Sequence, residues 1–166
     1  MKYMRIRASS HFLLKLATLI DAQFFTGAHK ILNNFKEIYV VISPSTGRPR
    51  MIVDERNNRL FSIRASDFKL IPTLYTAKLL KDLAKYPKLR VVVCNEISEF
   101  IAKGGNVFAR HVMIVDEDIR AGDDVIITNE EDKLLAIGRA KLSATEMLFF
   151  TRGVAVITRE SVMDDE

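Results

Sequence analysis

The sequence is poor in the residues that build disulfides, metal sites and flexible chains. Its 166 residues include a single cysteine, Cys94, with seven glycines, four prolines and no tryptophan. One cysteine excludes an intramolecular disulfide and a zinc site made of several cysteines. So few glycines and prolines, in a chain that is 48% hydrophobic, exclude a collagen-like or low-complexity protein and predict folded domains.

Long hydrophobic runs are also missing. No uncharged apolar stretch approaches the ~18 residues that a transmembrane helix needs. The apolar stretch after the basic residues 1–7 is interrupted by Lys15 and Asp21 and has no clear cleavage site, so we do not expect a signal peptide. We therefore expect a cytoplasmic protein with no membrane partner.

Charge is distributed unevenly along the chain. Residues 1–89 carry 16 lysines and arginines against 6 aspartates and glutamates, a net charge of +10, whereas residues 90–166 carry 9 against 15, a net charge of −6. This asymmetry predicts two domains, 1–89 and 90–162, followed by a frayed acidic tail at 163–166. The basic domain favours a polyanionic partner such as nucleic acid, and a basic surface that is merely solvated is the alternative.

The first 89 residues have the pattern of an α+β domain. Ser9 and Ser10 are suitable N-cap residues for a helix that opens at His11. Pro72 introduces a second helix, predicted over residues 73–85. Between them we expect a short helix at 29–33 and an antiparallel meander of three strands, at 37–43, 50–54 and 59–64. This domain is therefore predicted to place helices on a small antiparallel sheet.

The second half has the pattern of a mostly-β domain. A short helix at 96–102 ends at two glycines, and Ser143 with Glu146 forms a capping box for another. The remaining β-rich runs predict strands at 90–94, 106–113, 124–128, 134–142 and 154–158. Several short strands with two short helices are typical of a small closed barrel.

Four motifs in this half resemble the PUA domain, a family named after pseudouridine synthases and archaeosine transglycosylases. They occur in the family's order, at 103–109 (KGGNVFA), 120–126 (RAGDDVI), 135–140 (LAIGRA) and 153–156 (GVAV). The resemblance covers essentially all of residues 90–162. It implies a mostly-β PUA pseudo-barrel that follows the α+β domain and that binds RNA.

The first half is similar to the small domain that precedes the PUA domain in the C-terminal region of archaeosine tRNA-guanine transglycosylases. The similarity lies in Thr46–Arg50, Leu60–Ala65 and Pro72 with its following helix. The catalytic barrel of those enzymes, with its aspartates and cysteine-rich zinc site, has no counterpart here. The resemblance implies a non-catalytic protein that binds tRNA and assists a separate transglycosylase catalytic subunit. A free-standing PUA protein in translation or ribosome assembly is the alternative.

The PUA resemblance also implies which residues face RNA. Two glycines in a loop let a phosphate or a base edge approach the backbone and its N–H donors, although they also serve simply to end a helix. Strand alternation places only one of Arg110 and His111 outward, whereas Phe108 is expected in the core. Gly138 and Gly153 are expected to allow tight backbone packing. The expected RNA-binding residues are Lys103, Gly104, Gly105, Asn106, Val107, Arg110 and His111.

A secondary basic patch is expected in the first half, where cations can follow phosphates. Each of these side chains taken singly is better explained as a solvated surface cation, and only the surplus of charge supports a patch. Its members are Arg48, Arg50, Arg64, Lys78, Lys81 and Lys85.

Signals for catalysis are nearly absent. The three histidines are far apart and lack metal-ligand spacing, and the chain contains no phosphate-binding loop and no GxGxxG motif. Cys94 follows three valines and is expected to be buried in a strand. We therefore expect no catalytic residue, no metal and no cofactor.

Overall fold

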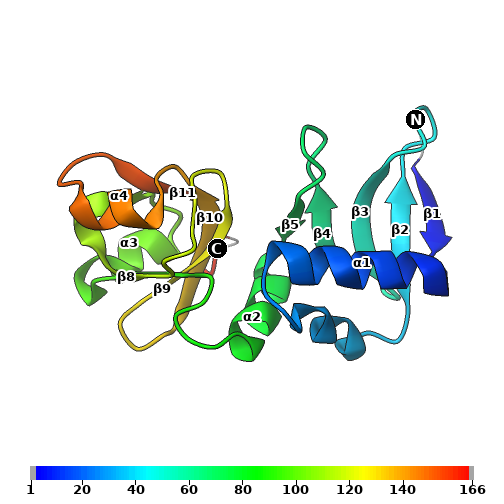
Figure 1. Ribbon diagram of the computed structural model, residues 1–166, viewed down its shortest axis with the longest axis horizontal. Coiled ribbons are helices and arrows are strands. Elements are labelled where there is room, and N and C mark those ends of the chain that lie inside the picture. The colour runs from blue at the N-terminus through cyan, green and yellow to red at the C-terminus, as the bar shows by residue number, and fades with distance from the viewer. Residues whose placement is uncertain (1–2, 165–166) are drawn as a thin grey trace. The chain divides into compact units, whose positions relative to one another are not determined.

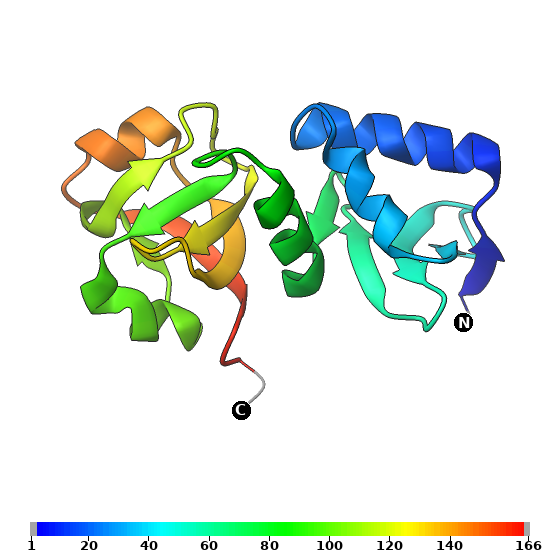
Figure 2. The same ribbon diagram turned by 90° about the horizontal axis from the view of Figure 1, so that it is seen from below.

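The computed structural model describes residues 3–164. Two compact units are present, Met1–Leu83 and Ala84–Glu166, and each contains its own sheet (Figures 1 and 2). The first is an antiparallel sheet with helices and the second is a curled mixed sheet, which confirms the predicted fold class. The exact domain boundary at residue 89 stays a prediction. Within residues 3–164, no helix has the length and apolar character needed to span a bilayer.

The first unit is a five-stranded meander in which each strand pairs with the next along the chain, in the order β1-β2-β3-β4-β5. Figure 1 shows α1 lying across one face of this sheet. The elements are β1 (Met4–Arg7), α1 (Ser10–Gln23), the 3-10 helix η1 (Ala28–Asn34), β2 (Ile38–Ile42), β3 (Pro49–Asp54), β4 (Arg59–Ile63), β5 (Leu70–Pro72) and α2 (Leu74–Leu83).

Helix α1 forms where its cap and its apolar spacing predict. The Ser9 hydroxyl accepts a hydrogen bond from the Phe12 N–H (3.1 Å), which satisfies one of the free donors at the helix start. Leu16, Ile20 and Phe24 recur every four residues and are buried. The Phe24 ring stacks on Phe61 of β4, with centroids 6.1 Å apart. The helix is therefore held on the sheet by a single apolar stripe.

The expectation of three strands in this unit is wrong, because β1 and β5 extend the sheet at both edges. All four residues of β1 are exposed, so no alternation of buried and exposed positions marks it. Strand β5 has only three residues and ends at Pro72, which therefore belongs to the strand. Its outer edge is bonded by the Gln23 amide, which donates to the Leu70 carbonyl (2.6 Å) and accepts from the Leu70 N–H (2.8 Å). Contacts between residues far apart in sequence stabilise such a strand, and a local pattern does not reveal them.

The second unit is a six-stranded sheet in the order β7-β11-β10-β9-β6-β8, in which β6 and β9 are parallel and the other pairs are antiparallel. The elements are β6 (Arg90–Val93), the 3-10 helix η2 (Asn95–Ile97), α3 (Ser98–Ala102), β7 (Val107–Phe108), the 3-10 helix η3 (Ala109–His111), β8 (Val112–Val115), β9 (Asp124–Thr128), β10 (Leu134–Ala140), α4 (Ala144–Phe149) and β11 (Val154–Ser161). The predicted capping box of α4 is present, with Ser143 and Glu146 bonded to each other's backbone N–H groups.

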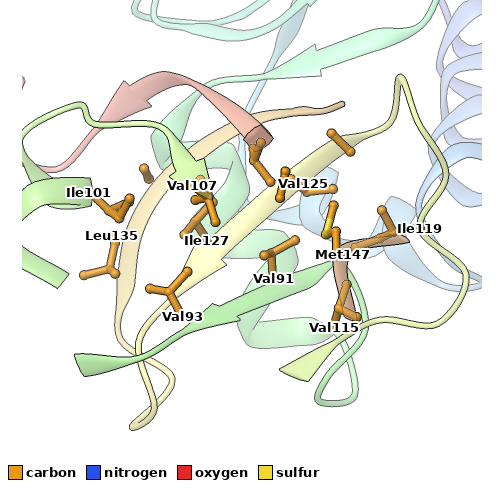
Figure 3. Close-up of a cluster of buried hydrophobic side chains, with 14 of the residues drawn as sticks. Val91, Val93, Ile101, Val107, Val115, Ile119, Val125, Ile127, Leu135 and Met147 are labelled. Carbon is orange, nitrogen blue, oxygen red and sulfur yellow. The ribbon is translucent and has the colours of Figure 1, made fainter. Parts of the chain in front are cut away.

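Small aliphatic side chains fill the inside of this curled sheet. Figure 3 shows Val91 and Val93 of β6 among side chains from α3, β7, β9, β10 and α4. Close packing also explains Gly138, where a Cβ atom would lie 2.4 Å from the Ile157 carbonyl oxygen. The same expectation is wrong for Gly153, which has a φ of +100° and no neighbouring atom within 4 Å of a Cβ position. That glycine serves a turn.

A buried arginine, Arg90 of β6, joins the segment before this strand to the turn between β9 and β10. The Arg90 guanidinium donates to both carboxylate oxygens of Asp132, at 3.1 and 3.0 Å, and to the Lys88 carbonyl at 3.0 Å. It also lies 5.5 Å from the centre of the Tyr86 ring. The cost of removing a charge from water is offset here by a bidentate partner and further bonds.

Two sequence expectations in this unit are wrong. The strand expected over 106–113 is interrupted by η3, where the buried Ala109 donates its N–H to the Gly153 carbonyl (3.0 Å) and the chain turns. Cys94 is partly exposed and lies just after β6, where its N–H bonds the His111 carbonyl (3.1 Å). In the expected acidic tail, the N–H of Met163 bonds the Ala102 carbonyl (2.9 Å), and residues 165 and 166 lie outside the described residues.

Candidate nucleic-acid interface

The glycine loop at residues 103–106 closes the end of α3. Lys103, Gly104 and Gly105 each donate the backbone N–H to a carbonyl of the preceding helical turn, at 2.9 to 3.1 Å. Gly104 has a φ of +106°, the left-handed conformation that commonly ends a helix. The N–H groups of the two glycines, expected as donors to a phosphate, are thus bonded within the protein. Ending the helix accounts for Gly104.

Gly105 is needed for a different reason. A Cβ atom at this position would lie 2.3 Å from the ring of Phe100, so the aromatic side chain occupies the space beside the glycine. Its φ is not in the left-handed region, whereas that of Gly104 is. The half-exposed Phe100 ring thus covers the Cβ side of Gly105, and the approach of RNA to the backbone at this position stays a prediction.

The rest of the loop is fastened to β11. The side-chain oxygen of Asn106 accepts from the Thr158 N–H (3.0 Å), and the Thr158 hydroxyl donates to the Gly105 carbonyl (2.7 Å). The Val107 side chain is fully buried in the core, so only the backbone of this residue is left to meet RNA. Asn106 and Val107 thus position the loop, and the groups that can meet a ligand lie at its ends.

Three side chains follow the loop, the exposed Phe108 and Arg110 and the partly buried His111. The Arg110 guanidinium lies 5.7 Å from the centre of the Phe108 ring, and its Nε donates to Nε2 of His111 (3.4 Å). The rings of Phe108 and His111 meet edge to face, with centroids 6.4 Å apart. We call these three residues the aromatic–arginine cluster. Aromatic faces and guanidinium planes of this kind stack on unpaired bases, and arginine also bonds phosphate.

Two expectations about this cluster are corrected. Arg110 and His111 lie on the 3-10 helix η3 and not on a strand. The alternation that would point them to opposite faces is therefore absent, and both contribute to one cluster. Phe108 was expected in the core but is exposed at the end of β7. The turn at the buried Ala109 changes the direction of the chain after Phe108, and no local signal in the sequence announces it.

Lys103 is less available than its charge suggests. Its ammonium group lies 2.9 Å from the Glu99 carboxylate, one helical turn earlier. The hydrogen bond from Lys103 lowers the pKa of Glu99 below its ordinary value. Both side chains are largely exposed, so the pair is weak and an RNA phosphate can compete for the lysine.

The six residues of the expected basic patch fall into separate groups. Arg48 follows the turn after β2, and its guanidinium lies 5.6 Å from the centre of the Phe68 ring. Phe68 lies in the turn between β4 and β5, and in the same turn Arg64 pairs with Asp67 (3.3 Å). Arg50 lies within β3. Lys78 and Lys81 lie on α2, and Lys85 belongs to the second compact unit. Arg48 and Arg64 therefore lie at adjoining turns of the first sheet, whereas the three lysines lie elsewhere.

Residues that could serve catalysis remain scattered. His29 is paired with Asp21, at 3.0 Å from its Nδ1. Burial acts to raise the pKa of Asp21, but the hydrogen bonds from His29 and Gly27 outweigh it and lower that pKa overall. No group of three histidine, cysteine, aspartate or glutamate side chains within residues 3–164 is placed to hold a metal ion.

Comparison with known families divides the chain in the same way as its charge. Residues 89–162 match the PUA domain, and residues 15–87 match the patch-forming domain C2 of tRNA-guanine transglycosylase. Curated relatives named tRNA-guanine(15) transglycosylase include one from Methanobrevibacter smithii, 42% identical over 159 residues, and one from Pyrococcus furiosus, 41% identical over 150. These alignments cover 95% and 90% of this chain. The chain spans only about a quarter of each relative's length, 24% and 25%.

A solved structure of similar size supports the fold. A hypothetical protein from Pyrococcus horikoshii OT3 aligns with a TM-score of 0.73 at 23% identity, covering 97% of this chain and 96% of that one. This likeness concerns the fold alone. The two matched segments show that the chain carries a PUA domain at residues 89–162, preceded at residues 15–87 by the patch-forming domain C2 of tRNA-guanine transglycosylase.

Proposed function

We propose that this chain binds tRNA, and that it assists the guanine exchange of a separate transglycosylase chain without catalysing the exchange itself. The observation that carries the first part is the aromatic–arginine cluster, which places an exposed aromatic ring and an exposed cation, together with a partly buried imidazole, beside the loop of a PUA domain. The relatives named tRNA-guanine(15) transglycosylase support tRNA as the RNA.

Two observations support the accessory role. The chain spans about a quarter of those relatives, and its described residues bring together no metal-ligand group. Exchange of a base inside folded tRNA requires the base to leave its stack, at a cost of a few kcal/mol. A module that grips the tRNA elsewhere offsets part of that cost through binding energy made away from the reacting base.

A binding experiment tests the RNA-binding part. Labelled tRNA, with and without its 3′-terminal CCA, is titrated with the protein and with the Phe108→Ala and Arg110→Ala variants. Stacking on an aromatic side chain is worth ~1–3 kcal/mol per base, so Phe108→Ala should weaken binding by about 5- to 100-fold. If Arg110 contacts a phosphate, its variant should also reduce the slope of log affinity against log salt by about one.

Phe149→Ala is the matched control, because this phenylalanine of α4 is 79% exposed and lies outside the cluster. It should bind tRNA like the unmodified protein. Both cluster variants binding normally, with thermal melts unchanged, would show that the cluster is not the RNA interface.

The accessory part is tested by reconstitution with a transglycosylase chain. Guanine exchange into tRNA is measured with the catalytic chain, with this protein, and with both. We expect no exchange by this protein alone and faster exchange by the pair at low tRNA concentration. Exchange by this protein alone would refute the non-catalytic role. Association with ribosomal particles in place of the catalytic chain would favour the alternative role in translation or ribosome assembly.

A further inference from the structure

A groove on the outer face of β10 and β11 is lined by cations although the unit that contains it is acidic overall. Its volume is about 610 Å³, and its lining includes Arg139, Lys141 and Arg159 together with Thr158 and Gly122. None of the residues that line it is acidic. A concave surface of one sign of charge concentrates ions of the opposite sign. The groove is therefore built to attract an anion.

Two of the three cations face solvent. Arg139 and Lys141 are exposed, and neither forms an ion pair with any residue in the part of the chain from 3 to 164. Arg159 is paired with Asp124, whose side chain is almost fully buried, and this pair fixes the guanidinium at the groove wall. The groove thus contains two cations without an ion pair, Arg139 and Lys141, and a third, Arg159, whose guanidinium is held in place by its partner.

Arg139 lies against the turn that precedes β9. Its guanidinium is 3.8 Å from where a Cβ atom of Gly122 would be, an ordinary van der Waals distance, so the backbone conformation and not a lack of space accounts for the glycine. Gly122 has a φ of +96° in the turn before β9, a conformation that side chains disfavour. Arg139 and Ile157 are partners across the two strands, which places both on the outward face.

The groove adjoins the glycine loop through a single residue. Thr158 lines the groove, and it is also the residue whose N–H and hydroxyl bond Asn106 and Gly105. A nucleic-acid strand that passes beside the loop can therefore reach the groove through the surface at Thr158. Phosphates repeat regularly along a nucleic acid, and a row of separate cations matches that spacing better than it matches a single small anion.

We propose that Arg139, Lys141 and Arg159 form a second RNA contact, which holds backbone phosphates of the strand that passes the glycine loop. This inference rests on the proposed RNA binding and extends it to a surface outside the loop and the aromatic–arginine cluster. The contact is made to phosphates, so it adds affinity and direction to the strand without reading its sequence.

The first test compares charge removal in the groove with charge removal elsewhere. The double variant Arg139→Ala, Lys141→Ala is titrated with labelled tRNA between 50 and 200 mM salt. Two lost phosphate contacts should lower the salt slope by about 1.4 to 1.8, from ~0.7–0.9 per contact, and weaken binding about tenfold or more at the lower salt. Lys133→Ala is the control, because this exposed lysine lies in the turn between β9 and β10 outside the groove lining.

A second test does not depend on tRNA. A six-nucleotide single-stranded RNA is titrated into isotope-labelled protein, and the backbone amide resonances are followed. We expect Gly122, Arg139 and Thr158 to shift together, and these shifts to disappear in the double variant while the remaining spectrum stays native.

The outcomes separate the two proposals. Tight tRNA binding that is equal in the double variant and the control, with no shifts at the groove, overturns the groove and leaves the proposed function intact. Groove shifts with the short RNA in a protein that does not bind tRNA would support the groove and overturn the proposed function.

Discussion

The two units contrast in how their charge is used. The first 89 residues carry a net charge of +10, yet several of their cations already have partners, such as Arg64 with Asp67 and Arg5, which lies 3.6 Å from the centre of the Tyr39 ring. The remaining residues carry −6, yet they contain both the aromatic–arginine cluster and the cationic groove. Net charge predicts long-range attraction, whereas the sites of contact depend on which charges lack partners and lie beside a concave or aromatic surface.

The units also differ in what stabilises them. A buried arginine with a bidentate carboxylate fastens the second unit, whereas side-chain bonds to the backbone complete the first. If the units fold independently, damage to one should leave the other protected. Amide hydrogen exchange followed by peptide mass spectrometry reports each unit separately, because its peptides are assigned by sequence.

The largest effect is expected from Asp132→Ala. It would leave the buried Arg90 guanidinium without its carboxylate, and breaking a buried pair costs roughly 3–5 kcal/mol, less where one partner is partly exposed. Asp132 is partly exposed, and its φ of +62° adds strain for alanine. We expect a loss of about 3 kcal/mol, seen as faster exchange throughout residues 84–164 only. Asp132→Asn tolerates the same backbone conformation and should cost less.

Faster exchange in both units after this change would contradict the claim that each unit is stabilised separately. It would mean that the first unit depends on the second for its stability, and that the two compact units form one cooperative structure.

A smaller effect is expected from Gln23→Ala in the first unit. The change removes both partners of the Leu70 backbone, and a buried polar group left unsatisfied costs ~1–3 kcal/mol. We expect about 2 kcal/mol, with faster exchange in peptides of α1 and β5 and none in the second unit. Lys15→Ala on the same helix is the control, because this lysine is exposed and should change stability by less than about 0.5 kcal/mol.

The smallest effect is expected from Gly105→Ala. The new methyl group would overlap the Phe100 ring, and forced packing of this kind costs ~1–3 kcal/mol, with the lower end expected for a half-exposed ring that can move. We expect about 1 kcal/mol from denaturant unfolding of the second unit. In a Phe100→Ala background the same change should cost almost nothing, so the double-mutant cycle measures the contact. Equal costs in the two backgrounds would show that Phe100 is not the obstacle.

Local patterns predicted much of this molecule. The caps of α1 and α4 and the order of strands β2 to β4 follow from serine positions and β-rich runs. The edge strand β5 and the exposure of Phe108 could not be predicted in the same way. The first depends on Gln23, 47 positions away, and the second on a turn made by the bond between Ala109 and Gly153. Both are long-range contacts, which alternation and turn propensity do not encode.

Of the expected RNA-facing residues, the structure gathers Arg110 and His111 and places Val107 in the core. The motif predicts where the loop lies. Whether each side chain of the loop is free to contact RNA depends on its partners in β11 and α3. The groove residues Arg139, Lys141 and Arg159 were overlooked because the charge count averages them with the many acidic residues of their unit. Counting charge for each face of each strand would have found them.

The amide of Gln23 has a consequence for assembly as well as for stability. Exposed strand edges recruit other strands, and this sheet has two edges. At β5 the Gln23 amide takes up the Leu70 N–H and C=O, so that an incoming strand would have to displace it. At β1 two of the four residues are arginines, Arg5 over the Tyr39 ring and Arg7 paired with Glu37, and charged side chains on an edge strand disfavour further pairing. The sheet is thus protected from further strands by an amide on one side and by charged side chains on the other.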